Sequence, residues 1–302
     1  MKPQFQHEAN TSFALWLDHY IGYKGESFSN KSAELYYTPD ERIENYPEDP
    51  YGFLSYNSEY KQWVYDSSLN GAEIPDGVYI DTGDGQYNFC QRGQSGLAFD
   101  FDNGRVLLSG AYFEDNFEDL KIKADFAVKD VNIYLSNESE DNLIFENKFN
   151  VNSRTVPDNA IGQGLPAYEQ VTPAAFISME NSYNEPYAFG GEDLTELNYR
   201  VVFFMEDLYQ LDGVLSMCTD AKNLGLCNLG YDHHPFNEYG DLKSGSYNYA
   251  NAVNYGPHRK SILYIEDVRA SKITDRYNKS INPQLYLGFV DFKVSQARYP
   301  RV

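Results

Sequence analysis

The first regular pattern of hydrophobic positions along the chain is that of a helix. Between residues 13 and 23, Phe13, Trp16, Leu17 and Tyr20 recur at three- and four-residue spacing and so share one helical face. Glycines at positions 22 and 25 fall where such a helix ends. The sequence therefore predicts a helix close to the N-terminus.

A second helix is predicted in the C-terminal half. Residues 199–205 form a continuous apolar run typical of a buried strand. From Asp207 the period changes, and Leu208, Leu211 and Leu215 recur at helical spacing, with Asp207 placed to cap the start. Residues 199–224 are therefore predicted to form a strand that leads into a helix.

Most of the other hydrophobic patterns indicate β-structure. Residues 120–128 alternate between apolar and polar side chains, as a half-buried strand does. The runs 97–101 and 105–109 flank Asn103-Gly104, which is a strong hairpin signal. Further strands are expected at 62–65, 77–81, 131–135, 174–178, 261–273 and 285–294. The predicted fold class is α+β and β-rich, with antiparallel sheets or a sandwich, an N-terminal helix and long extended loops.

Two segments interrupt these patterns. Residues 36–60 and 228–257 are rich in Tyr, and the first also in Pro and acidic residues. Because proline is excluded from regular helices and central strands, we expect extended arms there. We divide the chain into residues 1–115, with the helix, the first arm and hairpins, and an α+β domain of residues 116–302. The length also allows a single domain.

Charge narrows the classes of partner. The chain of 302 residues has 45 acidic side chains against 24 Lys and Arg, for a net charge of −21. Phosphate binding needs clustered basic residues, so we expect no direct nucleic-acid binding and no docking on anionic lipid. No apolar run approaches the roughly 20 residues of a membrane helix, and no export signal is apparent. The three cysteines lack C-x-x-C spacing and are expected to be reduced.

Residues that suggest chemistry are sparse. Asp100 and Asp102 partly match a calcium loop, but Phe101 breaks the ligand alternation, and an acidic hairpin turn is the alternative. His233 and His234 are adjacent and lack the spacing of a zinc site. With 45 acidic residues, no pair of carboxylates can be singled out for glycoside hydrolysis. We expect no catalytic residue, no metal, no cofactor and no enzymatic activity.

Aromatic residues make the strongest case for function. They form 16% of the chain and include 27 Tyr, a residue enriched at protein interfaces. We assign interface roles to residues of the N-terminal helix and the two arms: Phe13, Trp16 and Tyr20; Tyr36, Tyr37, Tyr46 and Tyr51; His233, His234, Phe236 and Tyr239. As alternatives, the helix covers a sheet of its own chain, and the Tyr-rich second arm stacks on sugars.

Several runs are informative in their order along the chain: residues 13–20 (FALWLDHY) with 24–28 (KGESF), 64–68 (VYDSS), 74–79 (IPDGVY), 93–97 (GQSGL), 103–108 (NGRVLL), 128–135 (VKDVNIYL) and 184–191 (NEPYAFGG). Taken together, these runs resemble virion structural proteins of tailed bacteriophages. The resemblance covers roughly residues 13–215 and consists of turns and strands, so it assigns no catalytic residue.

The resemblance implies a component of the virion, assembled in the host cytoplasm. Its expected partners are copies of itself in a cyclic homo-oligomer and other neck or tail proteins, with no nucleic acid and no membrane. The implied position is a ring at the neck, in the connector, collar or tail-terminator region. A baseplate or sheath-associated protein and a host-glycan-binding tail protein are the alternatives. A ring subunit needs two different surfaces that meet under cyclic symmetry, and the arms are suited to that reach.

Overall fold

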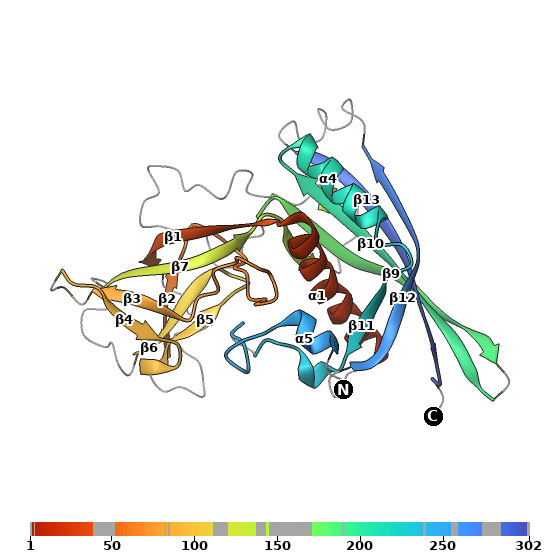
Figure 1. The fold of residues 1–302 in the computed structure, drawn as a ribbon, viewed down its shortest axis with the longest axis horizontal. Helices are drawn as coiled ribbons and strands as arrows, with labels where there is room; N and C mark the ends of the chain where they lie inside the picture. The colour runs from red at the N-terminus through yellow and green to blue at the C-terminus, as the bar shows by residue number, and fades with distance from the viewer. Residues whose placement is uncertain are drawn as a thin grey trace.

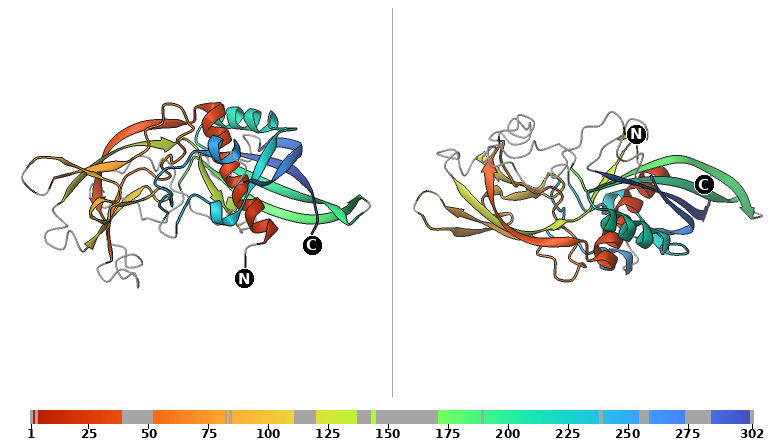
Figure 2. Two further views of the ribbon diagram at one scale, coloured as in Figure 1. Left: turned by 60° about the horizontal axis from the view of Figure 1, so that its bottom comes forward. Right: turned by 90° about the horizontal axis from the view of Figure 1, so that it is seen from above.

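The computed structural model describes residues 2, 4–38, 52–81, 83, 85–110, 120–136, 143–144, 171–188, 190–237, 240–254, 259–273 and 285–300. In this part of the chain, thirteen strands form two sheets, and helix α1 lies between them (Figures 1 and 2). The predicted β-rich α+β class is confirmed. No helix of the described residues is long and apolar enough to cross a membrane.

The first sheet has seven strands in the order β4-β3-β7-β1-β2-β6-β5, with antiparallel neighbours throughout. Its strands are β1 (Phe28–Tyr37), β2 (Phe53–Asn57), β3 (Gly77–Asp81), β4 (Asn88–Gln91), β5 (Ala98–Asp100), β6 (Arg105–Ser109) and β7 (Lys121–Lys129). In β7, Ile122, Ala124 and Phe126 are buried, while Lys121 and Asp125 are exposed, as the alternation predicts.

The hairpin predicted around Asn103-Gly104 connects β5 to β6. Gly104 has a φ of +62°, and a Cβ at this position would lie 1.9 Å from the carbonyl oxygen of Tyr60. Only glycine fits a turn with this backbone and this close approach. Gly104, which the sequence indicates as a turn residue, is therefore also required by the close approach of Tyr60.

The prediction of an extended arm across residues 36–60 is wrong at both ends. Strand β1 continues to Tyr37, and β2 spans Phe53–Asn57; both are central strands of the first sheet. The prolines that suggested an arm lie at positions 39, 47 and 50, outside both strands. Residues 39–51 lie outside the described part of the chain.

The second sheet has six strands in the order β11-β12-β13-β10-β9-β8. They are β8 (Asn132–Leu135), β9 (Ala174–Ala188), β10 (Glu192–Met205), β11 (Gly225–Leu229), β12 (Arg259–Lys272) and β13 (Tyr286–Arg298). Among the described strands, only β8 and β9 pair in parallel. The hairpin of β9 and β10 extends far beyond the body of the protein (Figure 1).

The apolar run that ends β10 is buried on both faces of this sheet. Val201 and Phe203 belong to the main hydrophobic cluster, whereas Val202 and Phe204 belong to a second cluster that includes Phe176 and Leu287. Since neighbouring strand residues point to opposite faces, the two clusters lie on opposite sides of the sheet. This explains why the run is continuous instead of alternating.

Three α-helices and two short 3₁₀ turns complete the described elements: α1 (Phe5–Gly25), η1 (Gln94–Gly96), α4 (Leu208–Thr219), η5 (Tyr231–His233) and α5 (Tyr249–Asn254). The Asp207 carboxylate accepts a hydrogen bond from the Tyr209 amide at 2.9 Å and caps α4 as predicted. Helix α4 packs on β13 so closely that a Cβ at Gly288 would lie 2.7 Å from Leu211.

The main hydrophobic cluster runs through α1 and both sheets. Phe13 stacks on Tyr199 of β10, while in the first sheet Trp63 stacks on Phe126. The division at residue 115 stays a prediction. Strand β7 begins beyond that point and completes the first sheet.

Candidate functional site

A cavity of about 430 Å³ opens between α1, the end of β7, strand β8 and the segment around residue 235. Its polar lining comes from distant parts of the chain, and its aromatic lining surrounds the same space. The polar residues are Thr11, Asp18, Gln62, Asp102, Asn103, Lys129 and His234, and the aromatic residues are Tyr65, Tyr134 and Phe236.

An ion pair joins two walls of this cavity. Asp18 lies on α1, and its carboxylate is 2.9 Å from the ammonium of Lys129 at the end of β7, with both side chains largely buried. The same ammonium lies 4.6 Å from the ring centroid of Tyr65. Burial and the adjacent Asp18 carboxylate raise the pKa of Tyr65 well above its ordinary value. The pair therefore attaches the helix to the first sheet within the cavity wall.

Asp102 is a carboxyl group of the lining whose pKa is moved toward neutrality. It keeps access to solvent through the cavity mouth, but the surrounding protein displaces much of its water and raises the pKa to about 6. The neighbouring charges of Asp100 and Asp18 raise it further, and Lys129 opposes them. Asp102 therefore gains its charge between mildly acidic and neutral pH.

Asp100, the other acidic residue of this turn, forms an ion pair and hydrogen bonds with residues of its own hairpin. Its carboxylate is 2.8 Å from Nε of Arg105 and accepts hydrogen bonds from the amide and side chain of Asn103. These contacts build an acidic hairpin turn. Among the described residues, no group of three or more His, Cys, Asp or Glu side chains lies close enough together to hold a metal ion.

His233 and His234 both line a second cavity but differ in burial. His233 is exposed at the end of η5, while His234 is half-buried between the first cavity and this second cavity of about 400 Å³. Burial, with a smaller contribution from Lys243, lowers the pKa of His234 to about 4. The His234 ring is therefore neutral at physiological pH and serves as a packing group beside Phe236.

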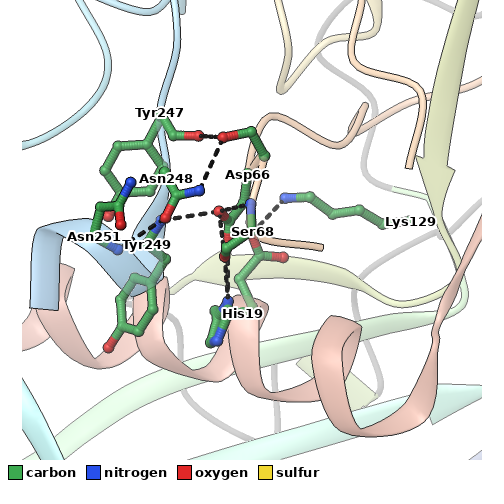
Figure 3. Close-up of polar contacts among 10 residues, drawn as sticks. His19, Asp66, Ser68, Lys129, Tyr247, Asn248, Tyr249 and Asn251 are labelled. Atoms are coloured by element: carbon green, nitrogen blue, oxygen red, sulfur yellow. Dashed lines mark hydrogen bonds and ion pairs between the residues drawn. The ribbon is translucent and has the colours of Figure 1, made fainter. Parts of the chain in front are cut away.

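A polar network next to the Asp18–Lys129 pair connects α1, residues 66–68 and α5 (Figure 3). Nδ1 of His19 is 2.7 Å from one Asp66 carboxylate oxygen, and the other oxygen accepts bonds from Ser68 Oγ at 2.7 Å and from the Tyr249 amide at 2.9 Å. The His19 ring also stacks on Tyr249 with centroids 4.5 Å apart. Burial alone would raise the pKa of Asp66, but these hydrogen bonds outweigh it and lower the pKa.

Although His19, Asp66 and Ser68 are the residue types of a hydrolytic triad, their geometry differs. In a triad, the carboxylate and the hydroxyl contact opposite nitrogens of the imidazole ring. Here Asp66 and Ser68 both approach Nδ1, and the Ser68 hydroxyl donates to Asp66. The imidazole therefore cannot take the Ser68 proton while held by Asp66, and the network holds α1, residues 66–68 and α5 together.

The predicted interface residues of the N-terminal helix lie inside the chain. Phe13 is 0% exposed and Trp16 is 5% exposed, and both rings contact Phe292 of β13. Tyr20 is half-buried, stacks on Trp16 and donates a hydrogen bond to the carbonyl of Met217 at 2.9 Å. Here α1 covers a sheet of its own chain, the alternative stated above, with Phe13 and Trp16 in the core. An interface role for the half-buried Tyr20 stays a prediction.

The residues assigned to the first arm are only partly described. Tyr36 and Tyr37 are half-buried strand residues of β1, and the ring of Tyr37 lies 5.7 Å from that of Tyr56. Tyr46 and Tyr51 lie outside the described residues. The assignment of these tyrosines to an interface stays a prediction.

The predicted second arm folds back on its own chain over its described length. Phe236 packs edge-on against Tyr65 at 4.6 Å, and Tyr247 forms an isolated β-bridge with Asp66. Tyr249 begins the short helix α5, which the sequence pattern did not predict. Tyr239 lies outside the described residues. This segment packs in that way because its rings complete the core between the two sheets.

Exposed aromatic residues gather at two other places that the sequence reasoning missed. Tyr79, Tyr87 and Phe89 lie on or beside β3 and β4, and Tyr183 and Tyr187 lie near the tip of the β9–β10 hairpin. One signal was present, because Tyr79 alternates with Val78 and Ile80 and must point away from the core. The polar surroundings of the hairpin residues provided no comparable signal.

No model of a known protein family matches the chain, and no curated protein matches it either.

Proposed function

We propose that this chain is a structural virion protein of a tailed bacteriophage that assembles with copies of itself into a ring at the neck. The proposal starts from the resemblance of the runs between residues 13 and 215. The observation that carries it is the long β9–β10 hairpin, which projects from the body (Figure 1) and has one edge without a partner strand among the described residues.

The open edge belongs to the outer half of β9. Strand β8 pairs with β9 only through residues 174–177, and in the described part of the chain no strand pairs with the same edge beyond Ile177. From Glu180 to Ala188 nearly every residue is exposed. Such an edge presents unpaired N–H and C=O groups to other chains, which is a liability for a monomer and a ready contact for an assembly.

The polar groups of the cavity and network also support a structural role. The Asp18 carboxylate is held by Lys129, and the Asp66 carboxylate by four donors. Carboxylates in these contacts tie segments of the fold together. An acidic cavity with aromatic walls is what the host-glycan alternative requires, but glycoside hydrolysis uses two carboxyl groups, and Asp18, one of the two among the described residues of this lining, is held by Lys129.

The first test is the mass of the purified full chain by native mass spectrometry, with negative-stain imaging of any large species. A single species at a whole-number multiple of 34.6 kDa, seen as closed rings, is expected. A compact monomer that is retarded by host surface polysaccharide in affinity electrophoresis would contradict the proposal and favour the glycan alternative.

The position in the particle is tested separately with gold-labelled antibodies against the purified chain. Label at the junction of head and tail of a virion is the expected result. Label confined to the sheath or the distal end of the tail would contradict the neck assignment and favour a sheath or baseplate component.

A further inference from the structure

We propose that neighbouring copies of this chain meet head to tail, with the tip of the β9–β10 hairpin of one copy against the β3–β4 end of the next. The inference rests on the proposed self-assembly and identifies its contact surfaces. The occupant of each surface is therefore a second copy of the same chain.

The acceptor surface is an aromatic patch on an edge of the first sheet. Tyr79 of β3 and Phe89 of β4 are register partners, with ring centroids 5.2 Å apart, and they are 39% and 50% exposed. Tyr87 precedes β4 and is also exposed. Strand β4 is the last strand of its sheet, so its outer edge has no partner among the described strands. Exposed aromatic rings beside an open strand edge are typical of a protein contact.

Two lysines, Lys121 and Lys123, lie beside this patch on the outward face of β7, which also carries the exposed Asp125. Lys123 is the register partner of Tyr79, and its ammonium lies 4.5 Å from the ring centroid of Tyr87. Lys121, two residues before it in β7, projects from the same face and is exposed. Lys123 also pairs with Glu34 at 3.2 Å, on the side of the patch away from β4.

The other surface, which we call the donor surface, is the tip of the β9–β10 hairpin, and it carries exposed tyrosines and glutamates. Tyr183 and Tyr187 are 42% and 63% exposed near the hairpin tip, and Glu180 and Glu185 are exposed beside them. The open edge of β9 passes through all four positions. One surface therefore combines aromatic rings with lysines, the other combines aromatic rings with glutamates, and each adjoins a free strand edge.

The positions of the two surfaces select the type of contact. They lie at opposite ends of the long axis of the molecule (Figures 1 and 2). Contact between two β3–β4 patches would place lysine against lysine, and contact between two hairpin tips would place glutamate against glutamate. Contact between a patch and a tip places lysine against glutamate, which pairs opposite charges. A contact between two different surfaces of identical subunits closes into a ring when the rotation allows it.

The test uses two half-competent variants of the full chain. The tip variant carries Tyr183→Ser and Tyr187→Ser, and the patch variant carries Tyr79→Ser and Phe89→Ser. Tyr209→Ser is the control, because Tyr209 is 84% exposed on α4, away from both surfaces. All the replaced rings are exposed, and unchanged thermal melting of each variant verifies that the fold is retained.

Each variant alone is expected to lose the ring, with self-association weakened about 30-fold or more, as for loss of a hot-spot ring. Mixed at equal amounts, they should form one heterodimer of twice the 34.6 kDa chain mass, since each retains the surface that the other lacks. The control should assemble like the wild-type chain. As a second set, Lys121→Glu with Lys123→Glu should weaken assembly, and Glu185→Lys in the partner should restore it.

Rings that persist in both double variants would overturn this contact and leave self-assembly intact. A mixture that stays monomeric while the wild-type chain forms rings would also overturn it. A wild-type chain that is itself monomeric in the same experiment would count against the proposed ring assembly, and the two failures are thereby distinguished.

Discussion

Replacing Phe13 with alanine tests the finding that the N-terminal helix belongs to the core. The Phe13 ring is completely buried and stacks on Tyr199 at 4.2 Å with 2° between the ring planes. It also lies 5.2 Å from the ring of Phe292 and 5.5 Å from that of Trp16. The substitution removes a ring enclosed by three other rings, at the contact between α1 and the second sheet.

The expected loss follows from this enclosure. Deleting a buried Phe side chain costs about 3–5 kcal/mol, and the cost is greater where the surroundings cannot collapse. The rings around Phe13 are rigid and held by other contacts, so we expect about 4 kcal/mol. For 302 residues the entropy of unfolding is about 0.6 kcal/mol/K, and Tm should fall by about 6 °C.

Urea unfolding followed by tryptophan fluorescence measures this loss, because Trp16 and Trp63 are both buried. Tyr209→Ala is the matched control, and its exposed ring should leave the free energy of unfolding within about 0.5 kcal/mol of wild type. A Phe13→Ala chain that is destabilised by less than about 1 kcal/mol and fails to assemble would refute the reasoning and return the helix face to an interface role.

Three further outcomes are expected. Lys129→Met should lower the free energy of unfolding in urea by about 3–5 kcal/mol because it leaves Asp18 buried without its partner; adding Asp18→Asn should recover part of the loss, and no recovery would refute the pairing. Asp102→Asn should raise Tm at pH 8, since a carboxyl group with a raised pKa destabilises the folded state once ionised, and the gain should vanish below about pH 4, the unfolded value; a gain independent of pH would contradict this. Cys218 and Cys227 are buried and Cys90 is half-buried, so Ellman's reagent should modify one thiol in the native chain and three in denaturant. Rapid modification of all three thiols in the native chain would contradict the fold.

Local sequence patterns were sufficient to predict an element where one of its faces is buried. The alternation of residues 120–128 and the Asn103-Gly104 turn predicted β7 and the β5–β6 hairpin. The helical spacing of Phe13 and Trp16 predicted the face that α1 buries, although the pattern did not say whether that face meets its own chain or another. The spacing of hydrophobic residues shows which side chains share a face of a helix or strand, and this spacing can be seen within one segment of the sequence.

Elements without such a pattern were missed. The outer half of β9 is a run of polar residues, yet it is a strand because β10 supplies hydrogen-bonding partners as far as Ala188. Strand β1 alternates weakly and is held between β7 and β2. Backbone pairing of this kind is almost independent of side-chain type, so it leaves little trace in the sequence of the strand itself.

By itself, the sequence determined the β-rich class, the strongly acidic charge, and the faces and turns that depend on a few consecutive residues. Only the tertiary structure decided that Phe13 meets Tyr199, that His19 and Tyr249 share the Asp66 carboxylate, and that exposed aromatic rings gather at opposite ends of the molecule. These contacts join residues far apart in the chain. Their formation depends on how the loops close and the sheets curve, which no local period encodes.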